Sequence, residues 1–296
     1  MAAPYEDGNW TSPDGLTLHF RDYPGPEGGT KTPVLCLHGL TRNARDFAEL
    51  AEHIAPSRRV IVPDMRGRGM SDHAPDSDTY NPLTYVADVD KLLAEQGIER
   101  FVAIGTSMGG LMTMLLARKY AEAGSGKGTE RIAGAVLNDI GPEIETAGLE
   151  RISGYVGQGR SYPTWIHAAR SLGEVHGEAF PDYDLEDWLE MAKRTMVVSQ
   201  NGRISYDYDM AIAEPFAKPG NAAPGDLWSA FEALAGTPML LVMGELSDLI
   251  SPATAARMKD INPLMETVTV PRVGHAPTLD EPEARAAIDA LLAGIA

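Results

Sequence analysis

One continuous stretch, residues 101–120, constrains the fold of this chain more than any other. It begins with the apolar run Phe101–Ile104, which predicts a buried strand, and ends with the helix-forming run Leu111–Tyr120. Between the two lies Gly105-Thr-Ser-Met-Gly109, which matches the pattern G-x-S-x-G. A strand that passes directly into a helix through this pattern makes a sharp turn, with glycine where side chains would collide.

This turn predicts a chemical role for Ser107. Its hydroxyl is expected to stand clear of the backbone at the N-terminus of the following helix, where partial positive charge favours a developing anion. A serine held between a strand and a helix in this way is typical of a nucleophile elbow. We therefore interpret Ser107 as a catalytic nucleophile and not as part of a structural turn.

Composition and charge exclude several classes of protein. The 296 residues are 44% hydrophobic, enough for one large α/β domain or two small ones. The net charge of −17 argues against a nucleic-acid partner and gives no attraction to an anionic membrane. The chain shows neither a signal-peptide pattern nor an apolar run of about 18 residues. Its single cysteine, Cys36, fits a reducing compartment, so we expect a cytoplasmic protein.

Short apolar runs alternate with helical segments along much of the chain. The runs predict strands of a mostly parallel sheet that helices cover on both faces. They are Val34–Leu37, Val60–Val62, Phe101–Ile104, Ile132–Leu137 and, after a long interruption, Met239–Met243. The interruption predicts a helical insertion over the strand ends, where ligands bind in open α/β sheets. We therefore predict an α/β core of residues 1–140 and 235–296 and a helical lid of residues 141–234.

The predicted lid is rich in aromatic residues and holds three of the four tryptophans, Trp165, Trp188 and Trp228. Aromatic side chains can provide the apolar walls of a substrate pocket, although they can equally pack the interior of the lid. Arg203 can bind a substrate carboxylate or form a surface salt bridge. The candidate substrate-binding residues are Trp165, Trp188, Tyr155, Tyr162 and Arg203.

Five motifs follow expected strands in a fixed order. They are His38-Gly39, Asp64-Met-Arg-Gly-Arg-Gly-Met-Ser71, the elbow, Gly244-Glu-Leu-Ser-Asp248 and Gly274-His275. In this order they resemble the α/β-hydrolase fold family, from Leu16 to the C-terminal helix. The Ser-Met-Gly-Gly branch of that family includes carboxylesterases, lactonases, meta-cleavage C–C hydrolases and cofactor-free perhydrolases. The resemblance implies a mostly parallel central sheet, helices on both faces and a helical cap inserted before the late strands.

A serine nucleophile needs a general base, and histidine serves best near neutral pH. His275 lies in the loop after the last expected strand, which returns to the sheet edge where Ser107 is expected. The family order is Ser, then Asp or Glu, then His, which favours Asp248 as the acid that orients His275. Glu245 and Asp139 remain alternatives, Asp139 because it follows the strand Ile132–Leu137.

The remaining motifs predict how the reaction centre is supported. A tetrahedral oxyanion needs two aimed donors, and we expect the backbone N–H groups of Met108 and Leu40. His38 is expected to brace its own loop. We interpret Asp64, Arg66 and Arg68 as structural, with Asp64 binding loop amides and the two arginines pairing with carboxylates. No spacing suggests a metal or cofactor site.

These residues predict a serine hydrolase that cleaves a small carboxylic ester or lactone through an acyl-enzyme formed on Ser107. A C–C hydrolase of a vinylogous diketone acid is the alternative, because it uses the same residues and needs cations such as Arg203 and Arg194 near the pocket. A ligand-binding receptor on the same fold is a third reading, against which the complete set of Ser107, Asp248 and His275 argues. A homodimer is compatible with the sequence.

Overall fold

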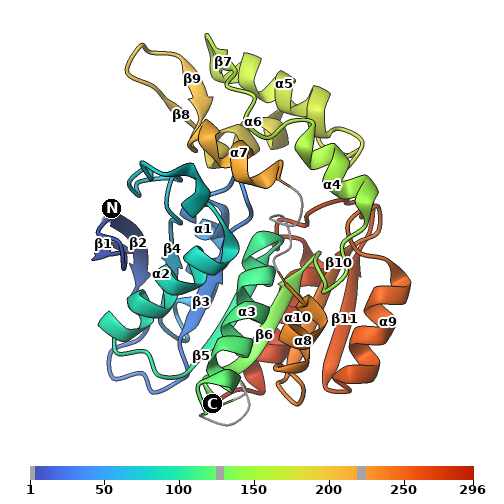
Figure 1. The fold of residues 1–296 in the computed structure, drawn as a ribbon. Helices are drawn as coiled ribbons and strands as arrows, with labels where there is room; N and C mark the ends of the chain where they lie inside the picture. Colours follow the sequence, from blue (N-terminus) through green and yellow to red (C-terminus); the bar gives the residue numbers. More distant parts are fainter. Residues whose placement is uncertain (1–3, 125–129, 219–224) are drawn as a thin grey trace.

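The computed structural model describes residues 4–124, 130–218 and 225–296 and is built on an eight-stranded sheet (Figure 1). The strand order is β1-β2-β4-β3-β5-β6-β10-β11. β2 runs antiparallel to both of its neighbours, whereas all pairs from β4 to β11 are parallel. The strands are β1 (Glu6–Thr11), β2 (Thr17–Tyr23), β3 (Val34–Leu37), β4 (Val60–Pro63), β5 (Phe101–Thr106), β6 (Ile132–Asn138), β10 (Met239–Gly244) and β11 (Met265–Val270).

Helices cover both faces of this sheet, as the sequence predicted. One face carries α2 (Pro82–Glu95), α3 (Met108–Glu122), α8 (Leu227–Glu232) and α9 (Pro252–Ile261). The other carries α1 (Ala48–Ile54), which follows the 3₁₀ turn η1 (Ala44–Phe47), and α10 (Pro282–Ala293). A second 3₁₀ turn, η2 (Ser77–Thr79), precedes α2. Within the described ranges, none of the helices combines the length and the apolar character needed to cross a membrane.

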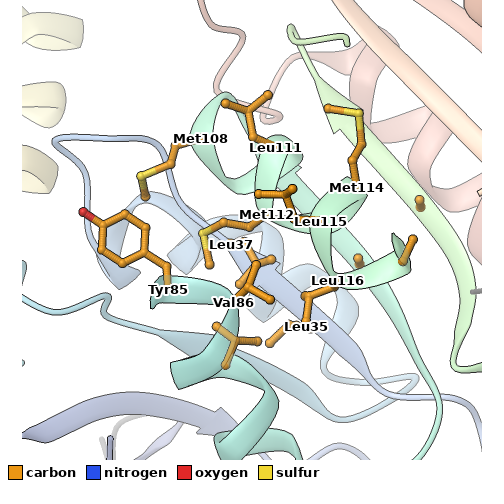
Figure 2. Close-up of a cluster of buried hydrophobic side chains, with 14 of the residues drawn as sticks. Leu35, Leu37, Tyr85, Val86, Met108, Leu111, Met112, Met114, Leu115 and Leu116 are labelled. Atoms are coloured by element: carbon orange, nitrogen blue, oxygen red, sulfur yellow. The ribbon is translucent and has the colours of Figure 1, made fainter. Parts of the chain in front are cut away.

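The central strands are buried on both faces, which explains their unbroken apolar runs. All residues of β3, β4, β5 and β6 are buried. Along β3, Leu35 and Leu37 join the core beside α2 and α3, whereas Val34 and Cys36 join the core on the opposite face. Figure 2 shows Leu35 and Leu37 beneath the apolar side chains of α3. Burying a leucine in such a core contributes about 1.5–3 kcal/mol, so this packing holds α3 firmly on the sheet.

An insert between β6 and α8 forms a separate layer at one end of the sheet (Figure 1). We define the insert as residues 141–218. A small antiparallel sheet, in the order β7-β9-β8, packs there with the helices. The elements are α4 (Thr146–Ser153), β7 (Ser161–Tyr162), α5 (Trp165–His176), α6 (Leu185–Thr195), β8 (Met196–Val198), β9 (Ile204–Tyr206), η4 (Met210–Ile212) and α7 (Ala213–Phe216).

The core resumes earlier than the sequence predicted. Residues 227–232, expected in the lid, form α8 and pack along α3, and Phe231 is fully buried in the same core cluster. Trp228, which was expected among the lid aromatics, lies with its ring under the guanidinium of Arg257 from α9, 3.7 Å from the ring centroid. Trp228 therefore belongs to the core face and not to the insert.

Candidate active site

The turn between β5 and α3 has the strained geometry that its glycines allow. Ser107 has φ of 52° and ψ of −114°, a conformation that L-residues rarely adopt. A Cβ on Gly105 would lie 2.4 Å from the backbone of Gly109, and a Cβ on Gly109 would lie 1.9 Å from the carbonyl oxygen of Leu37. Both positions therefore require glycine, and the close approach of α3 to the sheet fixes the position of Ser107.

His275 connects Ser107 to a buried carboxylate. Its Nε2 lies 2.9 Å from the hydroxyl oxygen of Ser107, and its Nδ1 lies 2.8 Å from Oδ2 of Asp139. The side chain of His275 is 7% exposed and that of Asp139 is fully buried. The three residues thus form a continuous hydrogen-bonded relay at the carboxyl end of the sheet.

The carboxylate beside His275 is Asp139, and the predicted contact of His275 with Asp248 is not found. Register explains the position of Asp139: Thr106 at the end of β5 pairs with Asn138 at the end of β6, so the next residues, Ser107 and Asp139, leave the sheet side by side. Asp139 Oδ1 accepts a hydrogen bond from the Gly244 N–H at 2.9 Å, and Oδ2 accepts one from the Ser247 hydroxyl at 2.7 Å. These donors orient the carboxylate toward His275.

Asp248 is committed to a different partner. Both of its carboxylate oxygens accept hydrogen bonds from Arg151 of α4, at 2.5 and 2.7 Å. Burial opposes ionisation of Asp248, but the hydrogen bonds and the charge of Arg151 outweigh burial and lower the pKa of this carboxyl below its ordinary value. Asp248 lies farther along its loop than Asp139, which follows β6 directly. Glu245, the other alternative, accepts a hydrogen bond from the Arg272 N–H at 2.7 Å.

The two expected oxyanion donors lie beside Ser107. Leu40 and Met108 both line the cavity that contains Ser107 and His275. Met108 begins α3, where the first N–H groups have no partner within the helix. Among the described residues neither N–H group donates a hydrogen bond. Both N–H groups therefore lack a hydrogen-bond partner in the described part of the chain, as the expected role requires.

His38 braces the loop that carries Leu40, as predicted. The Met65 N–H donates to His38 Nε2 at 3.0 Å, so Nδ1 carries the proton and donates to the Gly39 carbonyl at 2.8 Å. Burial lowers the pKa of His38 to about 4, which keeps the ring neutral at ordinary pH. This histidine is structural, and it is not in contact with Ser107.

In the charged loop of residues 64–71, the contacts of Asp64 and Arg66 agree with the structural roles expected for them, whereas those of Arg68 do not. Asp64 accepts hydrogen bonds from the backbone N–H groups of Ala44 and Met70, at 2.6 and 3.1 Å. Arg66 forms ion pairs with Asp14 at 2.8 Å and Asp88 at 2.7 Å. Arg68 does not fit the prediction, because its hydrogen bonds go to neutral groups and not to a carboxylate.

The cavity at Ser107 has a volume of about 140 Å³ and is bounded by both the core and the insert. Of the predicted substrate-binding residues, Tyr155 lines this cavity and the other four do not. Trp188 packs against the rings of Phe180 and Tyr183 inside the insert, and Trp165 joins the same apolar cluster. The hydroxyl of Tyr162 bonds to Ser171 at 2.8 Å, and Arg203 bonds to Ser161 at 2.8 Å.

Sequence reasoning missed most of the insert residues that line the cavity. They are Ile144, Leu149, Ile152, Val156, Leu172, His176, Phe180, Met191, Thr195, Tyr206, Tyr208 and Phe216. A signal was present for some of them. Leu149 and Ile152 lie three residues apart on α4, a spacing that places both on one face, and Val156 follows in the turn after that helix. Tyr206 and Tyr208 are two residues apart in extended chain, which places both side chains on one side.

Neither a metal cluster nor a reactive cysteine is found in the part of the chain that the structure describes. They contain no group of three or more His, Cys, Asp or Glu side chains placed to hold a metal ion. Cys36 is fully buried in β3, and burial raises the pKa of its thiol, which leaves the thiol unreactive.

Comparisons with known proteins find a matching family model, similar sequences and a solved structure with the same fold. A family model described as "alpha/beta hydrolase fold" matches residues 32–282. The 3-hydroxybutyrate-oligomer hydrolase of Cupriavidus necator is 34% identical over 279 residues, which cover 92% of this chain and 91% of that protein. The 2-(acetamidomethylene)succinate hydrolase of Mesorhizobium japonicum is 25% identical over 260 residues, covering 88% and 85%. The crystal structure of an alpha/beta hydrolase from Novosphingobium aromaticivorans is 57% identical, covers 100% of both chains and superposes with a TM-score of 0.92.

Proposed function

Since this chain belongs to the α/β-hydrolase family and is a hydrolase, we propose that it cleaves carboxylic esters with Ser107, His275 and Asp139 as its catalytic triad. The observation that carries the proposal is the relay from Ser107 through His275 to Asp139, with hydrogen bonds of 2.9 and 2.8 Å. Nucleophile, base and orienting acid are thereby all within hydrogen-bonding reach, as this chemistry requires.

Acylation begins when the Ser107 oxygen attacks the ester carbonyl carbon and passes its proton to His275 Nε2. The carbonyl π electrons move to oxygen, and the resulting oxyanion accepts hydrogen bonds from the N–H groups of Leu40 and Met108. Asp139 holds the proton of His275 on Nδ1 and stabilises the imidazolium. The C–O bond then breaks, and His275 gives its proton to the leaving alkoxide. An acyl-enzyme on Ser107 remains.

Deacylation repeats these steps with water. His275 removes a proton from a water molecule as its oxygen attacks the acyl carbon. The bond to Ser107 breaks, the proton passes from His275 to the Ser107 oxygen, and the carboxylic acid leaves. Every proton transfer uses the same nitrogen of His275, so the mechanism needs no other acid or base.

We also propose that the insert acts as a lid that selects the substrate. Leu149 and Ile152 of α4, with Val156 in the turn after it, line the cavity together with residues of the core. A substrate bound at Ser107 would therefore lie between the sheet edge and the insert. Such a site is apolar with a few polar groups that fix orientation, which is the usual composition of a small-molecule pocket.

Two polar groups on the insert side point to the substrate class. Neither ring nitrogen of His176 nor the hydroxyl of Tyr206 has a hydrogen-bond partner among the described residues, although both residues line the cavity. Burial, together with the charges of Arg42 and Arg151, lowers the pKa of His176 to about 4, so the ring is a neutral donor and acceptor. A substrate with a second carbonyl or hydroxyl beyond the cleaved ester would satisfy these groups.

Short oligoesters of a hydroxy acid have this chemistry, because ester carbonyls recur along their chain. The Cupriavidus relative is named for hydrolysis of 3-hydroxybutyrate oligomers, which supports the same class. We therefore propose short hydroxyacyl oligoesters as the substrate class, with simple short-chain esters as slower substrates.

The C–C hydrolase alternative receives less support from the geometry. It needs cations facing the pocket, but the two candidates are engaged elsewhere, and Arg42, which does line the cavity, is paired with Asp46. Arg203 donates to the Ser161 carbonyl at 2.7 Å and does not line the cavity. Arg194 pairs with Glu49 at 2.6 Å and with Asp280 at 2.9 Å, also outside this cavity. Ester hydrolysis is therefore the function that the site favours.

A substrate panel tests the proposal. It contains p-nitrophenyl esters of increasing chain length, a lactone, a dienoate and the dimer and trimer of 3-hydroxybutyrate, and Ser107→Ala serves as the blank. We expect ester turnover in the wild type and a loss of roughly 10⁴- to 10⁶-fold in Ser107→Ala. Retention of more than a few per cent of activity in folded Ser107→Ala would rule out Ser107 as the nucleophile.

The same panel tests the proposed substrate class independently of ester hydrolysis itself. Tyr206→Phe removes one hydroxyl and should lower kcat/KM for the 3-hydroxybutyrate trimer by about tenfold, while p-nitrophenyl butyrate is affected less than threefold. Equal effects on both substrates, or no turnover of the trimer, would reject the oligoester class and leave esterase activity in place.

A further inference from the structure

Arg68 contacts both residues that provide the oxyanion donors of the proposed mechanism. Its Nε donates to the Leu40 carbonyl at 2.9 Å, and its Nη2 lies 3.9 Å from the sulfur of Met108. Nη1 donates to the Arg66 carbonyl at 2.7 Å and to the Tyr85 hydroxyl at 2.9 Å. Figure 2 shows Met108, at the start of α3, and Tyr85, on α2, facing one another at this place.

The charge of Arg68 is buried without a neutralising carboxylate. Its side chain is almost fully buried, and within the described ranges it takes part in no ion pair. Among the described residues, the guanidinium contacts neutral acceptors and the rings of Tyr85 and Tyr80, 4.8 and 5.7 Å from the guanidinium carbon. Arg66, two residues earlier in the same loop, is equally buried but is neutralised by Asp14 and Asp88.

A buried cation without a counter-charge costs free energy, so stability alone does not account for Arg68. Its position does offer an electrostatic benefit during catalysis. Negative charge develops on the substrate oxygen beside Leu40 and Met108, and a fixed positive charge behind these residues favours that charge at no reorganisation cost. The planar guanidinium also contacts both the loop that carries Leu40 and the start of α3, and so fixes their positions relative to each other.

The backbone around Arg68 is tied to the insert. Arg68 forms an isolated β-bridge with Tyr208, which lines the cavity. The Gly69 N–H donates to the Asp207 carbonyl at 3.2 Å, and the Asp209 N–H donates to the Gly67 carbonyl at 2.8 Å. The backbone that carries Arg68 is thus anchored to the insert, while the guanidinium reaches the loop that carries Leu40.

From these contacts we propose that Arg68 is a positioning residue for the oxyanion hole, which aligns Leu40 with Met108 and stabilises the transition state through its buried charge. The inference rests on the proposed esterase function. It assigns Arg68 a role that Arg66, with its carboxylate partners, does not share.

The test compares Arg68→Met and Arg68→Lys with the matched control Arg66→Lys. Each variant is assayed with p-nitrophenyl butyrate for kcat and KM, and with an alkyl trifluoromethyl ketone, whose serine adduct places an oxyanion in the hole. Removal of a direct oxyanion donor costs about 10²–10³ in kcat, so Arg68→Met should lower kcat by about 100-fold. KM should change less than threefold, and the inhibition constant of the ketone should rise by the same factor as kcat falls. Arg68→Lys keeps the charge but lacks the planar set of N–H donors, so its kcat should fall by about tenfold.

Arg66→Lys should lower the thermal midpoint but leave kcat and ketone inhibition of the folded enzyme within threefold of wild type. A kcat within threefold of wild type in Arg68→Met, or a lower kcat without weaker ketone binding, would overturn the inference. If Arg68→Met does not fold, Arg68→Lys decides by the same two measurements. A wild-type enzyme that cleaves no ester would refute the proposed function, whereas normal oxyanion binding in active Arg68 variants refutes only this inference.

Discussion

Two adjacent strands, β6 and β10, each lead into a turn that carries an aspartate, yet the two aspartates have different surroundings. Asp139, directly after β6, is fully buried and accepts hydrogen bonds from His275, Gly244 and Ser247. Asp248, farther along the turn after β10, is 32% exposed at its side chain and pairs with Arg151 of the insert. One carboxylate belongs to the proposed reaction centre of the core, and the other belongs to the contact between core and insert.

The difference shows that distance from the strand end decides which acid His275 meets. Asp139 is held by the sheet itself, because its N–H donates to the Val242 carbonyl of β10 at 2.8 Å. Asp248 has left the sheet and depends on its loop for position. A carboxylate that must keep the histidine tautomer fixed has to be placed rigidly, and the end of a central strand provides that rigidity.

If Asp139 and Asp248 differ in this way, the largest loss of activity is expected for Asp139→Asn. The amide cannot accept the Nδ1–H of His275 in the same way, so the imidazole loses its tautomer and the imidazolium loses its partner. We expect kcat for p-nitrophenyl butyrate to fall by roughly 10⁴-fold with little change in KM. Steady-state kinetics on protein with wild-type circular dichroism provide the measurement. A loss of this size in Asp248→Asn together with near-normal Asp139→Asn would reverse the assignment.

In the insert, we expect His176 to make the free energy of unfolding depend on pH. The pKa of His176 is lowered to about 4 in the folded protein, mainly by burial, from 6.5. Below pH 6.5 the unfolded chain therefore takes up a proton that the folded chain refuses until about pH 4, and the free energy of unfolding falls across this window as pH falls. The full shift corresponds to about 3 kcal/mol.

Urea unfolding of the wild type and His176→Phe at several pH values between 4 and 7 measures this effect. The wild type should lose stability relative to the variant as pH falls, and the exposed His53→Gln should follow the wild type. Parallel curves for wild type and His176→Phe would show that His176 titrates normally in the folded protein.

The smallest effect is expected for Asp248→Asn. A partly exposed ion pair contributes about 1 kcal/mol or less, and Asp248 does not contact His275, so kcat should fall less than about tenfold. Because the folded-state pKa of Asp248 is lowered, its contribution to stability is present above its ordinary pKa of 3.8 and is lost as pH falls through the folded-state value. Unfolding of Asp248→Asn, Arg151→Met and the double variant should give non-additive free energies. Strict additivity would mean that the pair does not form in solution.

The sequence by itself determined the parts of this protein that depend on neighbours along the chain. The glycines around Ser107 are required by close backbone approach, and the unbroken apolar runs indicate strands buried on both faces. The order of the motifs indicated the hydrolase family, and it predicted the contact between His275 and Ser107. These features are local, or follow from strand order, so a linear pattern is enough to predict them.

Only the tertiary structure decided which side chains meet across the sheet edge. Asp139 and Asp248 both follow parallel strands, and the register of β5 with β6 places Asp139 beside Ser107, while Arg151 draws Asp248 away. The cavity wall likewise includes Tyr155 and Tyr206, whereas the large aromatic Trp188 packs inside the insert. Which side chains meet depends on how segments distant in sequence are placed in space and on which charges they neutralise there. A sequence pattern holds no information on either.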